Sequence, residues 1–92
     1  MAEYSFGLSE FFSEAYRVEQ TVEARCDKGS FRVEAVAVLR GPNTDYTARY
    51  YQLIGGKWQW VQIQQVLAGD SDEAIHMGLA NLETYLKGKT AD

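Results

Sequence analysis

Two runs of alternating side chains flank a Gly55-Gly56 pair within YTARYYQLIGGKWQWVQIQQVL, residues 46–67. Alternation with period two on both sides of a two-residue glycine loop predicts a β-hairpin. Such a loop pairs Ile54 with Lys57, Leu53 with Trp58 and Tyr51 with Trp60. Because opposed residues share a face of the sheet, one row is formed by Tyr46, Ala48, Tyr50, Ile54, Val61, Ile63 and Leu67. The opposite row is formed by Arg49, Tyr51, Leu53, Trp58, Trp60, Gln62 and Gln64.

The preceding run, residues 31–40, also alternates and predicts a strand next to this hairpin. A four-residue loop over residues 41–44 places its apolar row on the same inner face as the aliphatic row of the hairpin. A loop one residue longer would invert every side chain. The inner row of this strand is Phe31, Val33, Ala35, Ala37 and Leu39.

Residues 16–26 form a third alternating run, with a turn over residues 27–30 that pairs Cys26 with Phe31. Its inner row is Tyr16, Val18, Val22, Ala24 and Cys26. A helix remains an alternative, because Phe11, Ala15, Val18 and Val22 also share one helical face. The strand would oppose Glu23 to Glu34 and Arg25 to Arg32, and like charges opposite one another are unfavourable. The β-branched residues and the DKG turn favour the strand.

The C-terminal segment has the spacing of an amphipathic helix over residues 71–87. Asp70 can cap its first turn and Glu73 lies three residues later, as in a capping box. Apolar residues then recur at intervals of four, three and four, at Ile75, Leu79, Leu82 and Leu86. Gly88 follows as a typical stop signal.

These elements predict one α+β domain over residues 1–92, with flexible ends at residues 1–7 and 88–92. Four antiparallel strands, at about 16–26, 31–40, 45–54 and 57–67, form a meander. The C-terminal helix covers one face of this sheet, and a short N-terminal helix is expected at about 9–15.

The composition argues against several broad classes. Nine basic and thirteen acidic residues give a net charge of −4, which disfavours a protein that needs many phosphate contacts on duplex DNA. The single cysteine, Cys26, excludes an internal disulfide framework and favours a cytoplasmic location. No apolar run approaches the roughly 18 residues of a membrane span.

No catalytic, cofactor or metal motif is present. His76 is the only histidine, and the predicted fold places no serine or cysteine nucleophile beside it. Cys26 is expected to act as a small inner-face hydrophobe. The acidic group Asp70, Asp72 and Glu73 is explained by helix capping and lacks the ligand spacing of a calcium loop. We therefore expect a non-catalytic protein without cofactor or metal.

The outer face of the predicted sheet carries the residue types that dominate binding hot spots. All five arginines, Arg17, Arg25, Arg32, Arg40 and Arg49, lie on it in the predicted register, interleaved with Glu19, Glu23 and Glu34. The candidate partner-binding residues are Arg32, Arg49, Tyr51, Leu53, Trp58, Trp60 and Gln62.

We expect this face to bind a protein partner or a second copy of the chain. Single-stranded nucleic acid is the alternative partner, with bases stacked on Tyr51, Trp58 and Trp60. A third possibility is purely structural: cross-strand aromatic pairs stabilise a wet face, and residues 4–12 fold over them.

Overall fold

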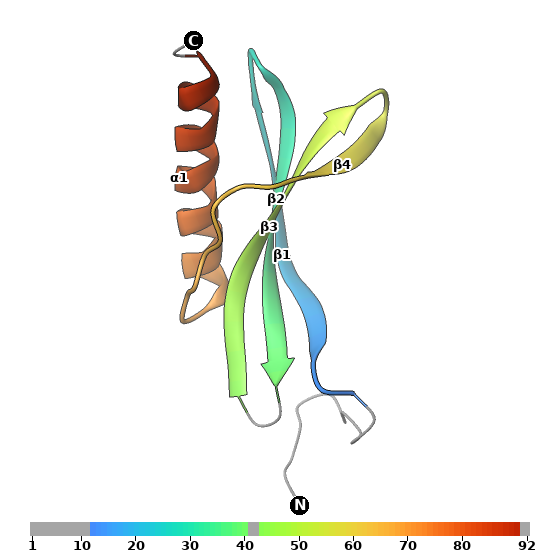
Figure 1. The fold of residues 1–92 in the computed structure, drawn as a ribbon, viewed down its shortest axis with the longest axis vertical. Coiled ribbons are helices and arrows are strands. Elements are labelled where there is room, and N and C mark those ends of the chain that lie inside the picture. The colour runs from blue at the N-terminus through green and yellow to red at the C-terminus, as the bar shows by residue number, and fades with distance from the viewer. Residues whose placement is uncertain (1–11, 41–42, 91–92) are drawn as a thin grey trace, which may run out of the picture.

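The computed structural model describes residues 12–40 and 43–90, and within them an antiparallel sheet carries one helix on one of its faces (Figure 1). The strands are β1 (Ala15–Cys26), β2 (Gly29–Arg40), β3 (Asn43–Ile54) and β4 (Lys57–Val61), and the helix is α1 (Ser71–Thr90). They lie in the order β1-β2-β3-β4, so the predicted α+β meander is confirmed. Residues 15–26 form a strand and not a helix. None of the described helical residues belongs to a segment long and apolar enough to cross a bilayer.

The β3–β4 hairpin has the predicted register. Ile54 pairs with Lys57, Leu53 with Trp58 and Tyr51 with Trp60. Gly55 and Gly56 have φ angles of 60° and 81°, the two positive values that a type I′ turn requires. Two glycines adopt this conformation without steric cost, which is why this turn could be read directly from the sequence.

The other two hairpins are each shifted by two residues from the predicted register. Cys26 pairs with Gly29 instead of Phe31, and Arg40 pairs with Asn43 across residues 41–42, which lie outside the described part of the chain. A shift of two keeps each side chain of β2 and β3 on its predicted face. It also removes the unfavourable charge opposition, because Glu23 now lies opposite Arg32 and forms an ion pair with it at 3.4 Å.

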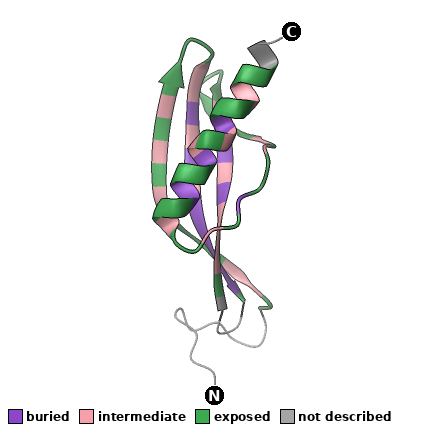
Figure 2. Cartoon of the chain, turned by 90° about the vertical axis from the view of Figure 1, so that its left-hand side faces the viewer, coloured by how far each residue is buried: buried purple, intermediate pink, exposed green. Residues whose placement is uncertain are grey.

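The core lies between α1 and the inner face of β2 and β3 (Figure 2). Val33, Ala35 and Ala48 of the sheet pack against Ile75 and Leu82 of the helix, and all five are buried. Each large apolar side chain buried in this way contributes roughly 1.5–3 kcal/mol. Gly and Ala line the contact, so the helix and the sheet approach each other closely.

The start of α1 is a reciprocal capping arrangement, as predicted. The Glu73 amide donates to Asp70 Oδ1 at 2.8 Å, and the Gly69 amide donates to Glu73 Oε1 at 2.7 Å. The end differs from the prediction, since the helix continues past Gly88 to Thr90. Gly88 has no positive φ angle, and an ion pair of 2.8 Å between Glu83 and Lys87 supports the last turns.

A β-bulge in β1 places the residues of its first half on the opposite faces from those predicted. The pairing shifts between Val18 and Gln20, so that Glu19 is the extra residue. Tyr16 and Val18 therefore lie on the outer face, opposite Val38 and Val36, and not on the inner face as predicted. Arg17 (predicted on the outer face) moves to the inner side, opposite Ala37.

The residue after the bulge connects β1 to the helix. Gln20 lies on the inner face, where its Nε2 donates to Ser71 Oγ at 2.8 Å and to Asp72 Oδ1 at 2.6 Å. These bonds tie the edge strand to the first turn of α1.

Strand β4 is shorter than predicted, because the chain must leave the sheet to reach α1. Ladder pairing ends at Val61, and residues 62–67 cross to the helix side, where the Ala68 amide donates to the Tyr46 carbonyl at 2.9 Å. Alternation ends with the strand. Val66 is buried, and Leu67, which was predicted on the inner face, is 77% exposed.

The predicted N-terminal helix over residues 9–15 is not seen. Residues 9–11 lie outside the described part of the chain, residues 12–14 are irregular, and Ala15 already belongs to β1.

Candidate interaction surface

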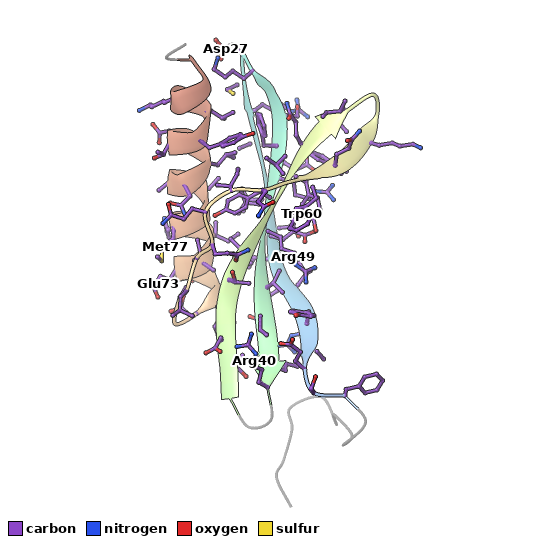
Figure 3. The ribbon with its side chains drawn as sticks, in the orientation of Figure 1. Asp27, Arg40, Arg49, Trp60, Glu73 and Met77 are labelled. Carbon is purple, nitrogen blue, oxygen red and sulfur yellow. The ribbon has the colours of Figure 1, made fainter. Side chains whose placement is uncertain are left out.

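The sheet face that points away from α1 carries the predicted site residues. We call the set Arg32, Arg49, Tyr51, Leu53, Trp58, Trp60 and Gln62 the aromatic–arginine face. Strand pairing brings six of them together, because Tyr51 lies opposite both Arg32 and Trp60, and Leu53 lies opposite Trp58. Figure 3 shows Arg49 and Trp60 close together on the side away from Met77 of the helix. Gln62 is exposed just after the end of β4.

Arg32 and Trp58 form the ordered part of this face. The guanidinium carbon of Arg32 lies 4.2 Å from the centroid of the Trp58 ring, within the range of a cation–π contact. One Arg32 Nη is held by Glu23, whereas Arg32 Nε is buried without a hydrogen-bond partner. Trp58 is half-buried, and its ring lies against this guanidinium.

Arg49 is held by an aromatic residue that the sequence analysis placed on the wrong face. Its guanidinium carbon lies 4.9 Å from the centroid of the Tyr16 ring, which the Glu19 bulge turns outward. Tyr16 thus belongs to the surface although it was predicted in the core. A signal for this was present in the sequence, because Gln20 falls in the supposedly apolar row of β1 and indicates that the alternation is interrupted there.

Trp60 is the most exposed apolar side chain of the face. Its side chain is 68% exposed, and Leu53 at the tip of the hairpin is 39% exposed. Arg49, Tyr51 and Trp60 line a shallow depression of about 390 Å³. A second cleft of about 530 Å³ adjoins it along β3 and is bordered by Tyr16, Arg49, Trp60 and the crossing segment 62–67. Exposed apolar patches mark interaction sites, and tryptophan, tyrosine and arginine are enriched in binding hot spots.

The charges on this side are mostly neutralised within the molecule. Arg32 pairs with Glu23, and Arg40 pairs with Asp45 at 3.1 Å and Glu14 at 3.0 Å. Arg49 differs from these, because it forms no ion pair with any described residue although Glu34 lies opposite it in the strand register. The exposed indole of Trp60 is therefore accompanied by a guanidinium without a carboxylate.

The other candidate residues are not gathered into a site. His76 is exposed on α1, and Cys26 is exposed at the end of β1, where its Sγ accepts a hydrogen bond from the Lys28 amide at 3.4 Å. Cys26 is thus less buried than its inner-face position predicted. Asp70 and Glu73 are used in capping α1, as described above. Within residues 12–40 and 43–90, no group of three or more potential metal ligands is found.

Comparison with known proteins adds no family assignment. The chain matches no protein-family model, and neither the curated proteins nor the solved structures contain a significant match.

Proposed function

We propose that this protein is a small, non-catalytic, cytoplasmic interaction module that binds another protein through the aromatic–arginine face. The observation that supports this most directly is the exposed Trp60 beside Arg49, whose charge has no carboxylate partner among the described residues. Trp, Tyr and Arg are the residues most enriched in binding hot spots. A partner that fits would present an apolar side chain next to an aspartate or glutamate.

The surrounding contacts suit such a role. Arg49 and Trp58 already take part in cation–π contacts, which lowers the conformational entropy lost when a partner orders them. Trp60 is the member to test, because Trp58 supports Arg32 and its loss would disturb the fold of the face itself.

The test is an affinity capture from the source cells with three forms of the protein. Wild type, Trp60→Ala and Met77→Ala are compared, since Met77 is an exposed apolar residue on the helix, on the opposite side of the molecule (Figure 3). We expect the same partner with wild type and Met77→Ala and its loss with Trp60→Ala. Removing a hot-spot tryptophan costs about 2 kcal/mol or more, roughly a thirtyfold weaker complex. Equal recovery with all three forms would reject this face as the binding site.

Single-stranded nucleic acid is the second candidate partner. The exposed indole of Trp60 can stack on a base, and Arg49 can meet a phosphate. Carboxylates on the same side, Glu23, Glu34 and Asp45, oppose a phosphate backbone. A fluorescence titration of Trp60→Ala and wild type with single-stranded oligonucleotides at low and high salt distinguishes the two, since phosphate binding must weaken as salt rises.

A further inference from the structure

Strand β1 is a long open edge of the sheet. It is the terminal strand of the order β1-β2-β3-β4, and no described residue pairs with its outer side. None of its twelve residues is buried, as the strand at the left of Figure 2 shows. A long edge strand presents unpaired backbone groups and is a template for another strand.

The pairing with β2 fixes which backbone groups are free. Cys26 and Gly29 flank the two-residue turn, so the N–H and C=O groups of Cys26, Ala24 and Val22 point to β2. The N–H and C=O groups of the residues between them, Thr21, Glu23 and Arg25, therefore point outward. The bulge at Glu19 ends this regular stretch at its N-terminal side.

An apolar groove lies beside the same edge, on the face covered by the helix. It measures about 440 Å³ and runs between the end of β1 and the C-terminal half of α1. Its apolar lining is formed by Ala24, Cys26, Phe31, Leu79, Leu82 and Leu86. Since Ala24, Arg25 and Cys26 are themselves edge residues, the groove reaches the open side of the sheet.

We propose that two copies of this chain pair antiparallel through β1, with the two-fold axis at Ala24, and join their sheets into one of eight strands. The side-chain charges select this register and this partner. With the axis at Ala24, Glu23 of each copy faces Arg25 of the other, and the outward backbone groups of both residues are paired. Because the interface is isologous, this favourable pair forms twice.

The neighbouring registers are disfavoured by the same charges. An axis at Glu23 opposes the two Glu23 side chains, and an axis at Arg25 opposes Arg25 to Arg25 and Glu23 to Asp27. Arg25 forms no hydrogen bond or ion pair with its side chain among the described residues, so it is free to meet a carboxylate of the partner copy.

The same register extends the apolar groove across the axis. Val22 of one copy lies opposite Cys26 of the other, and the two Ala24 side chains meet on the inner face. Each groove beside Leu82 and Leu86 is then bordered by apolar residues of the partner copy and not by water. Backbone pairing, charge and apolar burial thus support one and the same arrangement.

A charge exchange tests the register. R25E places a glutamate opposite Glu23, E23R places an arginine opposite Arg25, and the double variant E23R/R25E restores opposite charges. Two altered pairs per dimer predict that either single variant raises the dimer dissociation constant at least about tenfold in sedimentation equilibrium. E23R also opposes an arginine to Arg32 within the chain, so circular dichroism first confirms that each variant is folded. The double variant then returns to within about threefold of wild type. A monomeric wild type at roughly 100 µM, or single variants that dimerise like wild type, overturns the proposal.

Disulfide formation gives a second, independent measurement. In C26S/A24C the two cysteines form a non-hydrogen-bonded pair across the axis, with Cα atoms about 4.5 Å apart, which a disulfide can bridge. We expect a covalent dimer under mild oxidation, whereas wild type remains uncrosslinked, because in this register its two Cys26 residues lie four positions apart along the strands, about 13 Å. No cross-link above the level of wild type refutes the register.

The W60A variant separates this interface from the aromatic–arginine face. Pairing through β1 does not involve Trp60, so W60A must dimerise as wild type does. A dimer lost in W60A and kept in R25E would refute the edge interface and assign self-association to the aromatic–arginine face.

Discussion

Gly78 lies where α1 packs closely on the sheet, and replacing it by alanine tests how tightly the two layers pack. A Cβ atom at this position would lie 2.8 Å from Val33 Cγ1 and 3.1 Å from Ala48 Cβ. Both neighbours are buried in the sheet. Val33 is β-branched and has few alternative rotamers, so the added methyl group cannot be accommodated by a small side-chain rotation.

The expected loss of stability follows from two opposing terms. Alanine improves helix propensity by about 1 kcal/mol relative to glycine, and overpacking a core costs about 1–3 kcal/mol. With one contact below 3 Å against a rigid neighbour, the cost lies toward the upper end, and Gly78→Ala loses about 1–2 kcal/mol net. Gly88 is in the same helix and meets nothing within 4 Å, so Gly88→Ala gains up to about 1 kcal/mol.

Urea and thermal unfolding followed by far-UV circular dichroism measure the difference. The two variants should differ by about 2–3 kcal/mol, which is on the order of 10 °C or more in Tm for a domain of this size. The double variant Gly78→Ala/Val33→Ala should be more stable than the sum of its single changes predicts, because the cavity left by one accepts the methyl group of the other. If Gly78→Ala were as stable as Gly88→Ala, the close packing of α1 on β2 and β3 would be refuted.

Two further perturbations address the polar contacts of the inner face. Burial raises the pKa of the Tyr50 phenol above its ordinary value of 10.0, and a hydrogen bond from Asn81 offsets part of this rise. The folded protein therefore holds that proton more tightly than the unfolded chain. The free energy of unfolding should therefore not depend on this group's ionisation at neutral pH, and it should fall as the pH rises above 10. The difference in unfolding free energy between wild type and Tyr50→Phe should become smaller in that range. If the two free energies ran parallel across the pH range, this reasoning would be contradicted. Gln20→Ala removes both hydrogen bonds from β1 to the first turn of α1 and should cost about 1 kcal/mol or more in urea unfolding, while Thr21→Ala, at the exposed position next to it, should change stability by less than about 0.5 kcal/mol.

Alternation and local turn chemistry made most of the sheet predictable. A run such as residues 31–40 reveals its inner and outer rows directly, because period two is enforced by the strand itself. The Gly55-Gly56 loop fixed its hairpin completely, since both glycines supply the positive φ angles of one turn type. The sequence pattern therefore places the candidate residues of β3 and β4 on the correct face of the sheet.

The lengths of the other two hairpin loops could not be predicted reliably from turn residues. Asp27-Lys28 and residues 41–42 form shorter connections than the sequence suggested, so two registers were displaced by two residues. The predicted register opposes Glu23 to Glu34, and this unfavourable pair indicates that the register is wrong. A shift of two residues replaces it by an ion pair between Glu23 and Arg32. Charge pairing across strands can thus identify a loop length that turn propensities leave open.

Features set by tertiary contacts were not predictable from local pattern. Strand β4 ends at Val61 because the chain then crosses to α1. In this crossing segment Val66 is buried and Leu67 is exposed, the reverse of what continued alternation predicts. Gln20 finds its hydrogen-bond partners at the distant Ser71 and Asp72. Neither partner lies near β1 in the sequence, so the local pattern marks Gln20 as an interruption of the apolar row without showing what it binds.

The bulge links the two faces of the sheet in one backbone irregularity. It turns Tyr16 outward, where its ring stacks on Arg49, while Gln20 on the C-terminal side of the bulge keeps its inner position and ties β1 to the start of α1. In a regular strand Gln20 would still face the helix, but the period of two would return Tyr16 to the helix side as well. Arg49 would then lose the ring on which it stacks. The conformation of Arg49 on the outer face therefore depends on the one extra residue, Glu19, in the edge strand.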